Sequence, residues 1–291
     1  MAPMLGVLVT VLAIGVGLVA RWFWRSFRPV QRAELEAFAG ASGLAVTVAN
    51  GPRVLEAIAR TRLWRMVGLL VAGSASAVAV VVRAVRTGVL HVGVEIVLWL
   101  LIGYFVGAVL GELLTAWSAP APGPRSASLR RREVGEYVGS WAVRWPRLLG
   151  AVGLVAALAA PALGDRSWWL PAAGVGAAVV WGVTVLVTRF VLERPQQPAA
   201  EDLLAADDAI RSRSLHALAA TAVGIELWLA ALAVIGLALT LLGRLGPDAE
   251  QGVPPLLAVV LVLAVPVSAV VVSRRLARRP FRVVREELAL R

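Results

Sequence analysis

Long apolar stretches separated by clusters of arginine dominate this chain and limit what it can fold into. A helix needs about 20 apolar residues to cross the roughly 30 Å hydrocarbon core of a bilayer. Seven stretches meet or approach that length: Pro3–Ala20, Met66–Val82, Val89–Trp117, Leu148–Leu163, Trp168–Phe190, Leu215–Leu242 and Val253–Ser273. The pattern therefore predicts an all-α fold, a polytopic transmembrane helix bundle of about seven spans.

The overall composition supports a membrane protein. Hydrophobic residues make up 59% of the 291 residues, against about 45–50% in soluble globular domains. A soluble chain of this length cannot enclose so much apolar surface. We expect the excess to face lipid, so that the lipid bilayer itself is the main partner of the chain.

The residues that most metal and cofactor sites need are scarce. The chain has no cysteine, which excludes disulfides, thiol catalysis and thiolate metal sites. Its two histidines are His91 and His216. No glycine loop for phosphate, paired-histidine motif or redox motif is present. The sequence predicts no cofactor, no metal site and no catalytic residue.

The distribution of arginine predicts how the chain is oriented. All 29 basic residues are arginine, and 25 of them lie in residues 21–65, 119–147, 189–213 and 274–291. The alternate connections hold only four. Because cytoplasmic loops are rich in Arg and Lys, we expect the N-terminus outside and the C-terminus in the cytoplasm of a multi-pass cell-membrane protein.

The net charge of +11 has two interpretations. In a soluble protein it would suggest binding to nucleic acid. Here the arginines flank apolar spans, where they meet anionic lipid head groups. We therefore predict anionic lipid at the cytoplasmic loops and no nucleic-acid partner.

Three regions follow from this pattern. Residues 1–20 form the first span, which is predicted to be retained because its arginines follow the apolar run, the reverse of a secretory signal. Residues 21–65 form a cytoplasmic helix–strand–helix segment. Residues 66–291 form a six-span membrane domain with short outer loops and an Arg-rich cytoplasmic tail.

The cytoplasmic segment shows local signals for each of its elements. A helix is predicted over Pro29–Ser42 and ends at Gly43, and Leu44–Val48 alternates like a short strand. Asn50–Pro52 predicts a turn, and Val54–Leu63 a helix that continues into the second span. The segment could form a lid, a surface for a cytoplasmic protein partner, or a helix lying on the membrane interface.

Two further loops are predicted to be helical. Residues 130–147 form a basic interfacial helix with Tyr137, Trp141 and Trp145 as anchors. The third cytoplasmic loop opens its helix with four acidic residues: Glu201, Asp202, Asp207 and Asp208. The helix dipole favours acidic groups in a first turn, a simpler explanation than a cation site.

Similar fragments recur along the chain. Ala57–Leu63 resembles Ala209–Leu215, and Val187–Pro195 resembles Val272–Pro280. The fragments suggest three tandem helical hairpins, an arrangement of repeats that transporters use. Convergence of arginine-flanked apolar helices explains the same similarity, and both explanations stay open.

Three carboxyl groups lie inside predicted spans, where ionisable residues are costly and often functional. They are Glu226, Glu95 and Glu112. Structural partners are available for two of them, since Glu95 could pair with Arg83 and Glu112 with Arg65. Glu226 has no evident partner. It is protonated, hydrogen-bonded to a neighbouring helix, or handles protons or substrate.

Three stretches carry a general resemblance to a group of proteins. Gly43–Arg65, Arg130–Tyr137 and Leu203–Leu218 resemble uncharacterised polytopic membrane proteins of high-GC Gram-positive bacteria. That group has no assigned activity. The resemblance implies membrane localisation and says nothing of mechanism.

Two classes of function remain open. The first is a transporter, or a membrane subunit of a transport complex with a cytoplasmic partner, which short outer loops favour. The alternative is a membrane-embedded enzyme acting on a lipid or lipid-linked substrate. An intramembrane serine at Ser74 or Ser76 with His91 as base would be one form of it, but small residues in a span more simply pack helices. Substrate and oligomeric state are not predicted.

Overall fold

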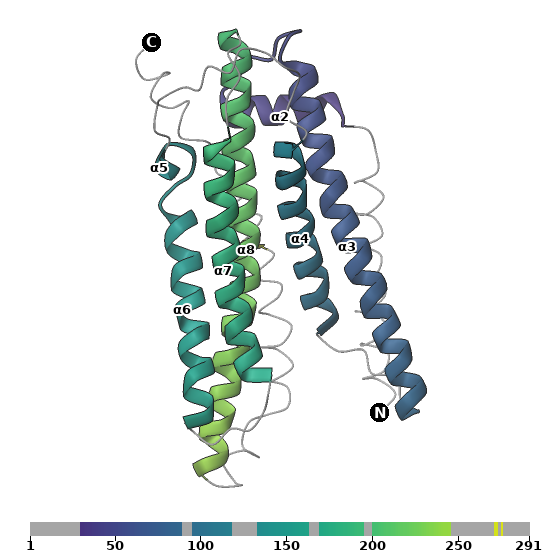
Figure 1. Cartoon of the computed structure of the whole chain (residues 1–291), viewed down its shortest axis with the longest axis vertical. Helices are drawn as coiled ribbons and strands as arrows, with labels where there is room; N and C mark the ends of the chain where they lie inside the picture. Colours follow the sequence, from purple (N-terminus) through teal and green to yellow (C-terminus); the bar gives the residue numbers. More distant parts are fainter. Residues whose placement is uncertain are drawn as a thin grey trace.

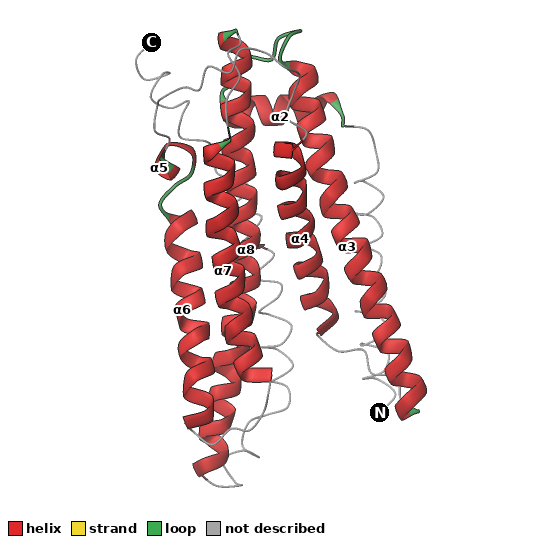
Figure 2. Cartoon of the chain, in the orientation of Figure 1, coloured by secondary structure: helices red, strands yellow, loops and turns green. Residues whose placement is uncertain are grey.

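The computed structural model is all-helical over the residues that it describes (Figures 1 and 2). These are residues 30–88, 95–117, 133–162, 169–194 and 200–245, with 271, 272 and 275. The helices are α2 (Arg32–Ser42), α3 (Gly51–Thr87), α4 (Glu95–Trp117), α5 (Val134–Tyr137), α6 (Trp141–Ala162), α7 (Trp169–Glu193) and α8 (Glu201–Leu245).

The long helices match the interior spans of the predicted topology. Four of them, α3, α6, α7 and α8, are long and apolar enough to cross a membrane, and α4 contains a shorter apolar helical stretch, Leu98–Leu114. These five helices cover the predicted second to sixth spans. The predicted first and seventh spans lie outside the described residues, so the count of seven, the orientation and the three tandem hairpins stay predictions.

The helix α8 holds the bundle together. The pair α3 and α4 lie side by side and antiparallel, as do α6 and α7 (Figure 1). The helix α8 packs along both α6 and α7 and also contacts α4. In its most apolar stretch 72% of the residues are buried, against 11% in α3. Most of the apolar stretch of α3 is thus exposed, whereas that of α8 faces protein.

Close contacts between backbones join the helices of each pair. A Cβ atom placed on Gly107 of α4 would lie 2.2 Å from the carbonyl oxygen of Trp64 in α3. One on Gly174 of α7 would lie 2.4 Å from the carbonyl oxygen of Gly153 in α6. Small residues at such positions let transmembrane helices approach closely, since packing rather than the hydrophobic effect drives their association in lipid.

The loop between α2 and α3 is a side-chain-stabilised turn and not the predicted strand. Helix α2 ends as expected at Gly43, whose φ of 62° is left-handed. Residues 44–47 then carry no strand. The side chain of the buried Asn50 accepts a hydrogen bond from the Thr47 N–H at 2.8 Å and donates one to the Ala45 carbonyl at 2.9 Å. These bonds occupy backbone groups that a strand would use for pairing.

The predicted basic helix over residues 130–147 is also interrupted. Helix α5 ends at Tyr137, Val138 is extended, and α6 begins at Trp141. Tyr137 is buried, and its carbonyl accepts a hydrogen bond of 2.6 Å from the Ser212 hydroxyl of α8. Ser140 precedes α6 as a residue type favoured at helix starts. The contact with α8 therefore divides a segment that local sequence alone would keep helical.

Segments predicted to be cytoplasmic gather at one end of the bundle. We call the end that carries α2, α5 and the first turns of α3 and α8 the α2 end (Figure 1). A small apolar core lies there, made of Phe38, Val54, Ile58, Ala206 and Ala209. It joins α2 and α3 to α8, which begins more than a hundred residues later in the chain.

The contact between α3 and α4 can be tested by adding one methyl group. We expect Gly107→Ala to lower the free energy of unfolding by about 1–3 kcal/mol, because its Cβ would meet a backbone oxygen. Gly182→Ala in α7 is the matched control, since nothing lies within 4 Å of a Cβ there. It should stabilise the protein by about 0.5–1 kcal/mol. Unfolding in mixed micelles, followed by tryptophan fluorescence, measures both variants, and equal values would contradict the contact.

Candidate functional site

The side chain of Glu226 is the most unusual polar group in the membrane part of α8. It is 0% exposed, and neither carboxyl oxygen has a hydrogen-bond partner among the residues that the structure describes. Its neighbours along the helix, Ile225 and Trp228, are fully buried as well. The sequence-based expectation that Glu226 lacks an evident partner stays a prediction, because two predicted spans lie outside the described residues.

An unpartnered carboxyl in apolar surroundings is unfavourable in both of its protonation states. The charged form loses its hydration, and the neutral form leaves a donor and an acceptor unsatisfied. Burial of this kind lowers stability and is retained in membrane proteins mainly where it serves function. Glu226 therefore remains the leading candidate among the three carboxyl groups.

The other two candidates lie elsewhere. Glu112 of α4 is buried near the hydroxyl of Ser214 and the guanidinium of Arg65. Arg65 directs its Nη1 to the hydroxyl of Tyr104 at 3.3 Å, so it is an electrostatic neighbour of Glu112 and makes its hydrogen bond elsewhere. The side chain of Glu95 lies outside the described residues, as does its predicted pairing with Arg83.

The structure does not bring the carboxyl groups of Glu112 and Glu226 together. Glu112 lies near Ser214, which precedes Glu226 by 12 residues in α8, a separation of about 18 Å along the helix. Among the residues that the structure describes, no cluster of three His, Asp or Glu could hold a metal ion. Glu226 and Glu112 therefore do not share a site.

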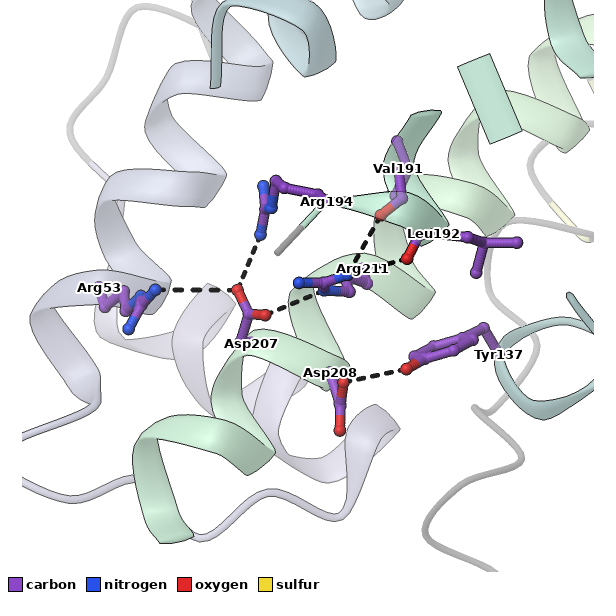
Figure 3. Close-up of polar contacts among 8 residues, drawn as sticks. All are labelled: Arg53, Tyr137, Val191, Leu192, Arg194, Asp207, Asp208 and Arg211. Atoms are coloured by element: carbon purple, nitrogen blue, oxygen red, sulfur yellow. Dashed lines mark hydrogen bonds and ion pairs between the residues drawn. The ribbon is translucent and has the colours of Figure 1, made fainter. Parts of the chain in front are cut away.

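A second polar site, at the α2 end, is built around Asp207 (Figure 3). Asp207 precedes the apolar part of α8 and is buried. Its carboxylate accepts hydrogen bonds from Arg194 Nη2 at 2.7 Å and Arg211 Nε at 2.9 Å, and Arg53 Nη2 lies 3.8 Å away. Burial alone raises the pKa of this carboxyl, but the three guanidinium groups outweigh it and hold the pKa below its usual value.

Arg211 connects this site to α7. Its side chain is 1% exposed, and its Nη1 donates to the carbonyl oxygens of Val191 at 3.2 Å and Leu192 at 3.4 Å (Figure 3). The last carbonyls of a helix lack partners within the helix. Arg211 thus satisfies the end of α7 while it pairs with Asp207.

The acidic residues of α8 follow the sequence-based interpretation only in part, since only Glu201 and Asp202 lie in its first turn. The helix dipole was expected to account for them. The carboxylate of Asp207 instead binds arginines, Asp202 accepts a hydrogen bond from Thr47 at 2.9 Å, and Asp208 accepts one from Tyr137 at 3.1 Å. These bonds attach neighbouring segments to α8, which a dipole argument about one helix could not reveal.

A cavity of about 180 Å³ also lies at the α2 end. It is lined by Ile58, Thr61, Arg62, Arg65, Met66, Tyr104 and Arg213, from α3, α4 and α8. The arginines were predicted from the sequence to set the topology, to meet anionic lipid and, for Arg65, to pair with Glu112. No local signal predicted their convergence, although residues of Ala57–Leu63 and Ala209–Leu215 line a common pocket.

Comparison with known proteins adds no functional assignment. No family model, no curated protein and no solved structure matches the chain. The candidate sites therefore depend on geometry and chemistry alone.

Removing the charge of Asp207 should destabilise the fold. We expect Asp207→Asn to lower the free energy of unfolding by about 3–5 kcal/mol at neutral pH, because it leaves buried guanidinium groups without an anion. Glu36→Gln is the matched control, since the Arg32–Glu36 pair has side chains 91% and 64% exposed and should contribute no more than about 1 kcal/mol.

The pH dependence of the free energy of unfolding, compared between wild type and Asp207→Asn, gives a second measurement. Because the pKa of Asp207 is lowered in the folded state, its contribution is complete above the unfolded pKa of about 3.9 and is lost as the pH falls through the folded pKa. The difference between wild type and Asp207→Asn should shrink in that acidic range. A difference independent of pH would contradict the assignment.

Proposed function

We propose that the protein is a multi-span component of the cell membrane that works as a transporter, or as the membrane subunit of a transport complex with a cytoplasmic partner. In this proposal the α2 end faces the cytoplasm, because the segments gathered there include most of the arginines of the described chain. Glu226 handles protons within the bundle.

The burial of Glu226 is the observation that carries the proposal. It lies 11 residues beyond Leu215, where the apolar part of α8 begins. That is about 16 Å along the helix, near the middle of a hydrocarbon core roughly 30 Å thick. Carboxyl groups at this depth form the proton relays of pumps and transporters.

The position of α8 supports the same role. It contacts α4, α6 and α7 and is the most buried of the long apolar helices. A movement of α8 relative to either neighbouring pair would change the surroundings of Glu226. A carboxyl that meets water in one arrangement and apolar side chains in another would take up a proton and release it, as coupling requires.

Proton flux through the reconstituted full-length chain tests the proposal. Liposomes with an imposed potassium diffusion potential and a trapped pH-sensitive dye should show proton uptake with wild type. Glu226→Gln should reduce the rate at least tenfold, because the amide cannot release a proton. Glu36→Gln, on the exposed face of α2, should keep the wild-type rate. A rate no higher than in protein-free liposomes, or an unchanged rate with Glu226→Gln, would argue against proton handling.

Replacement by leucine separates function from stability. We expect Glu226→Leu to raise the free energy of unfolding by roughly 1–3 kcal/mol, because it removes an unsatisfied buried group, and to abolish proton flux. Gain of stability with loss of activity is typical of residues retained for function. A loss of stability would show instead that the carboxyl has a structural partner in the folded protein.

A further inference from the structure

We propose that the cavity lined by Arg62, Arg65 and Arg213 is a binding site for a phosphate group. The site is separate from Glu226 and does not depend on proton handling. It gives one defined location for the contact between arginines and anionic groups that the charge pattern predicts only in general.

The three guanidinium groups come from two helices that approach each other at the α2 end. Arg62 and Arg65 are three residues apart in α3, so they lie on one face of that helix. Arg213 enters from α8, and Tyr104 of α4 closes another side of the cavity. The cavity of about 180 Å³ is larger than a single water requires, which is at least about 10–15 Å³.

Carboxylates do not pair with all of the arginines. Arg62 forms an ion pair with Glu34 of α2. Arg65 and Arg213 instead have aromatic neighbours, with guanidinium carbons 5.4 Å from the ring centre of Tyr104 and 5.2 Å from that of Phe38. A cation–π contact of this kind compensates less of the positive charge of an arginine than an ion pair with a carboxylate does.

One donor at the site has no acceptor in the described part of the chain. The Nε atom of Arg65 is buried and makes no hydrogen bond to any described residue. The nearby carboxyl of Glu112 lies within electrostatic range of Arg65 and next to Ser214. Three guanidinium groups thus meet two carboxyl groups, one of which is already paired. Like charges held together in a partly buried site are unfavourable unless an anion joins them.

Phosphate fits this arrangement better than a carboxylate. A guanidinium group presents its N–H donors in a planar fork, which matches two oxygens of a phosphate. A phosphate group offers further oxygens to a second and a third arginine, whereas a single carboxylate has only two. The convergence of three arginines from two helices therefore favours phosphate.

A phospholipid head group and a soluble phosphate compound share this chemistry. Two exposed leucines lie near the arginines along α3, Leu63 between Arg62 and Arg65 at 53% exposed and Leu70 beyond them at 41% exposed. Lipid tails beside these leucines would place a head group at the depth of the cavity. This favours phospholipid, and the experiment below distinguishes the two sources.

Binding is measured with the full-length chain purified in phosphate-free detergent. One arm titrates inorganic phosphate, and the other titrates nanodiscs or micelles containing phosphatidic acid, with phosphatidylcholine as the lipid control. Native mass spectrometry counts bound ligand, and the shift in unfolding temperature reports affinity. Saturable binding of inorganic phosphate indicates a soluble ligand, whereas binding of phosphatidic acid alone indicates a lipid head group, and either result supports the site.

Variants locate the binding. Arg65→Gln and Arg213→Gln should each weaken it at least tenfold, because each removes charge-assisted hydrogen bonds. Arg86→Gln, at the exposed far end of α3, makes the same change in net charge and should alter binding less than twofold. Arg65→Lys keeps the charge but loses the fork. Arg65→Lys therefore tests the geometry of the fork, and we expect it to bind more weakly than wild type. It keeps this test possible even if Arg65→Gln fails to fold.

Three results would overturn the inference. These are no saturable binding in either arm, equal binding by Arg65→Lys and wild type, and equal loss with Arg86→Gln and Arg213→Gln. Glu226→Gln should bind phosphate as wild type does. Failure of the phosphate site and failure of proton handling are therefore distinguishable.

Discussion

Close packing of α3 against α4, and of α6 against α7, is the constraint on which the rest of the structure depends. Lipid is as apolar as the helices, so burial of leucine and valine gives no net force between them. Contacts without intervening side chains, as at Gly107 and Gly174, supply dispersion energy instead. They fix the two pairs, and α8 then packs against both. Every polar contact at the α2 end presupposes this arrangement.

Polar groups in the described chain fall into two contrasting kinds. The carboxylate of Asp207 is surrounded by arginines and attaches α7 and α3 to α8. Its burial is compensated, so we regard it as structural. Glu226 and the Nε of Arg65 are buried without partners. A proton or a ligand gains the most binding free energy at an uncompensated buried group. Both proposals concern such groups.

The two proposals fit one molecule without depending on each other. Glu226 lies deep in α8, whereas the arginines lie at the α2 end, where α8 leaves its apolar stretch. Arg213 and Glu226 share one continuous helix. They are 13 residues apart, about 20 Å along that helix, so the two sites do not touch.

The sequence by itself determined the apolar helices and the end of α2 at Gly43, because each depends on local composition. It did not reveal the turn at residues 44–50, the break before α6, the partners of Asp207 or the arginine-lined cavity. Those depend on contacts between segments far apart in the chain, such as Thr47 with Asp202 and Tyr137 with Ser212. Local propensity describes one segment at a time, whereas only the packed bundle decides which distant side chains meet.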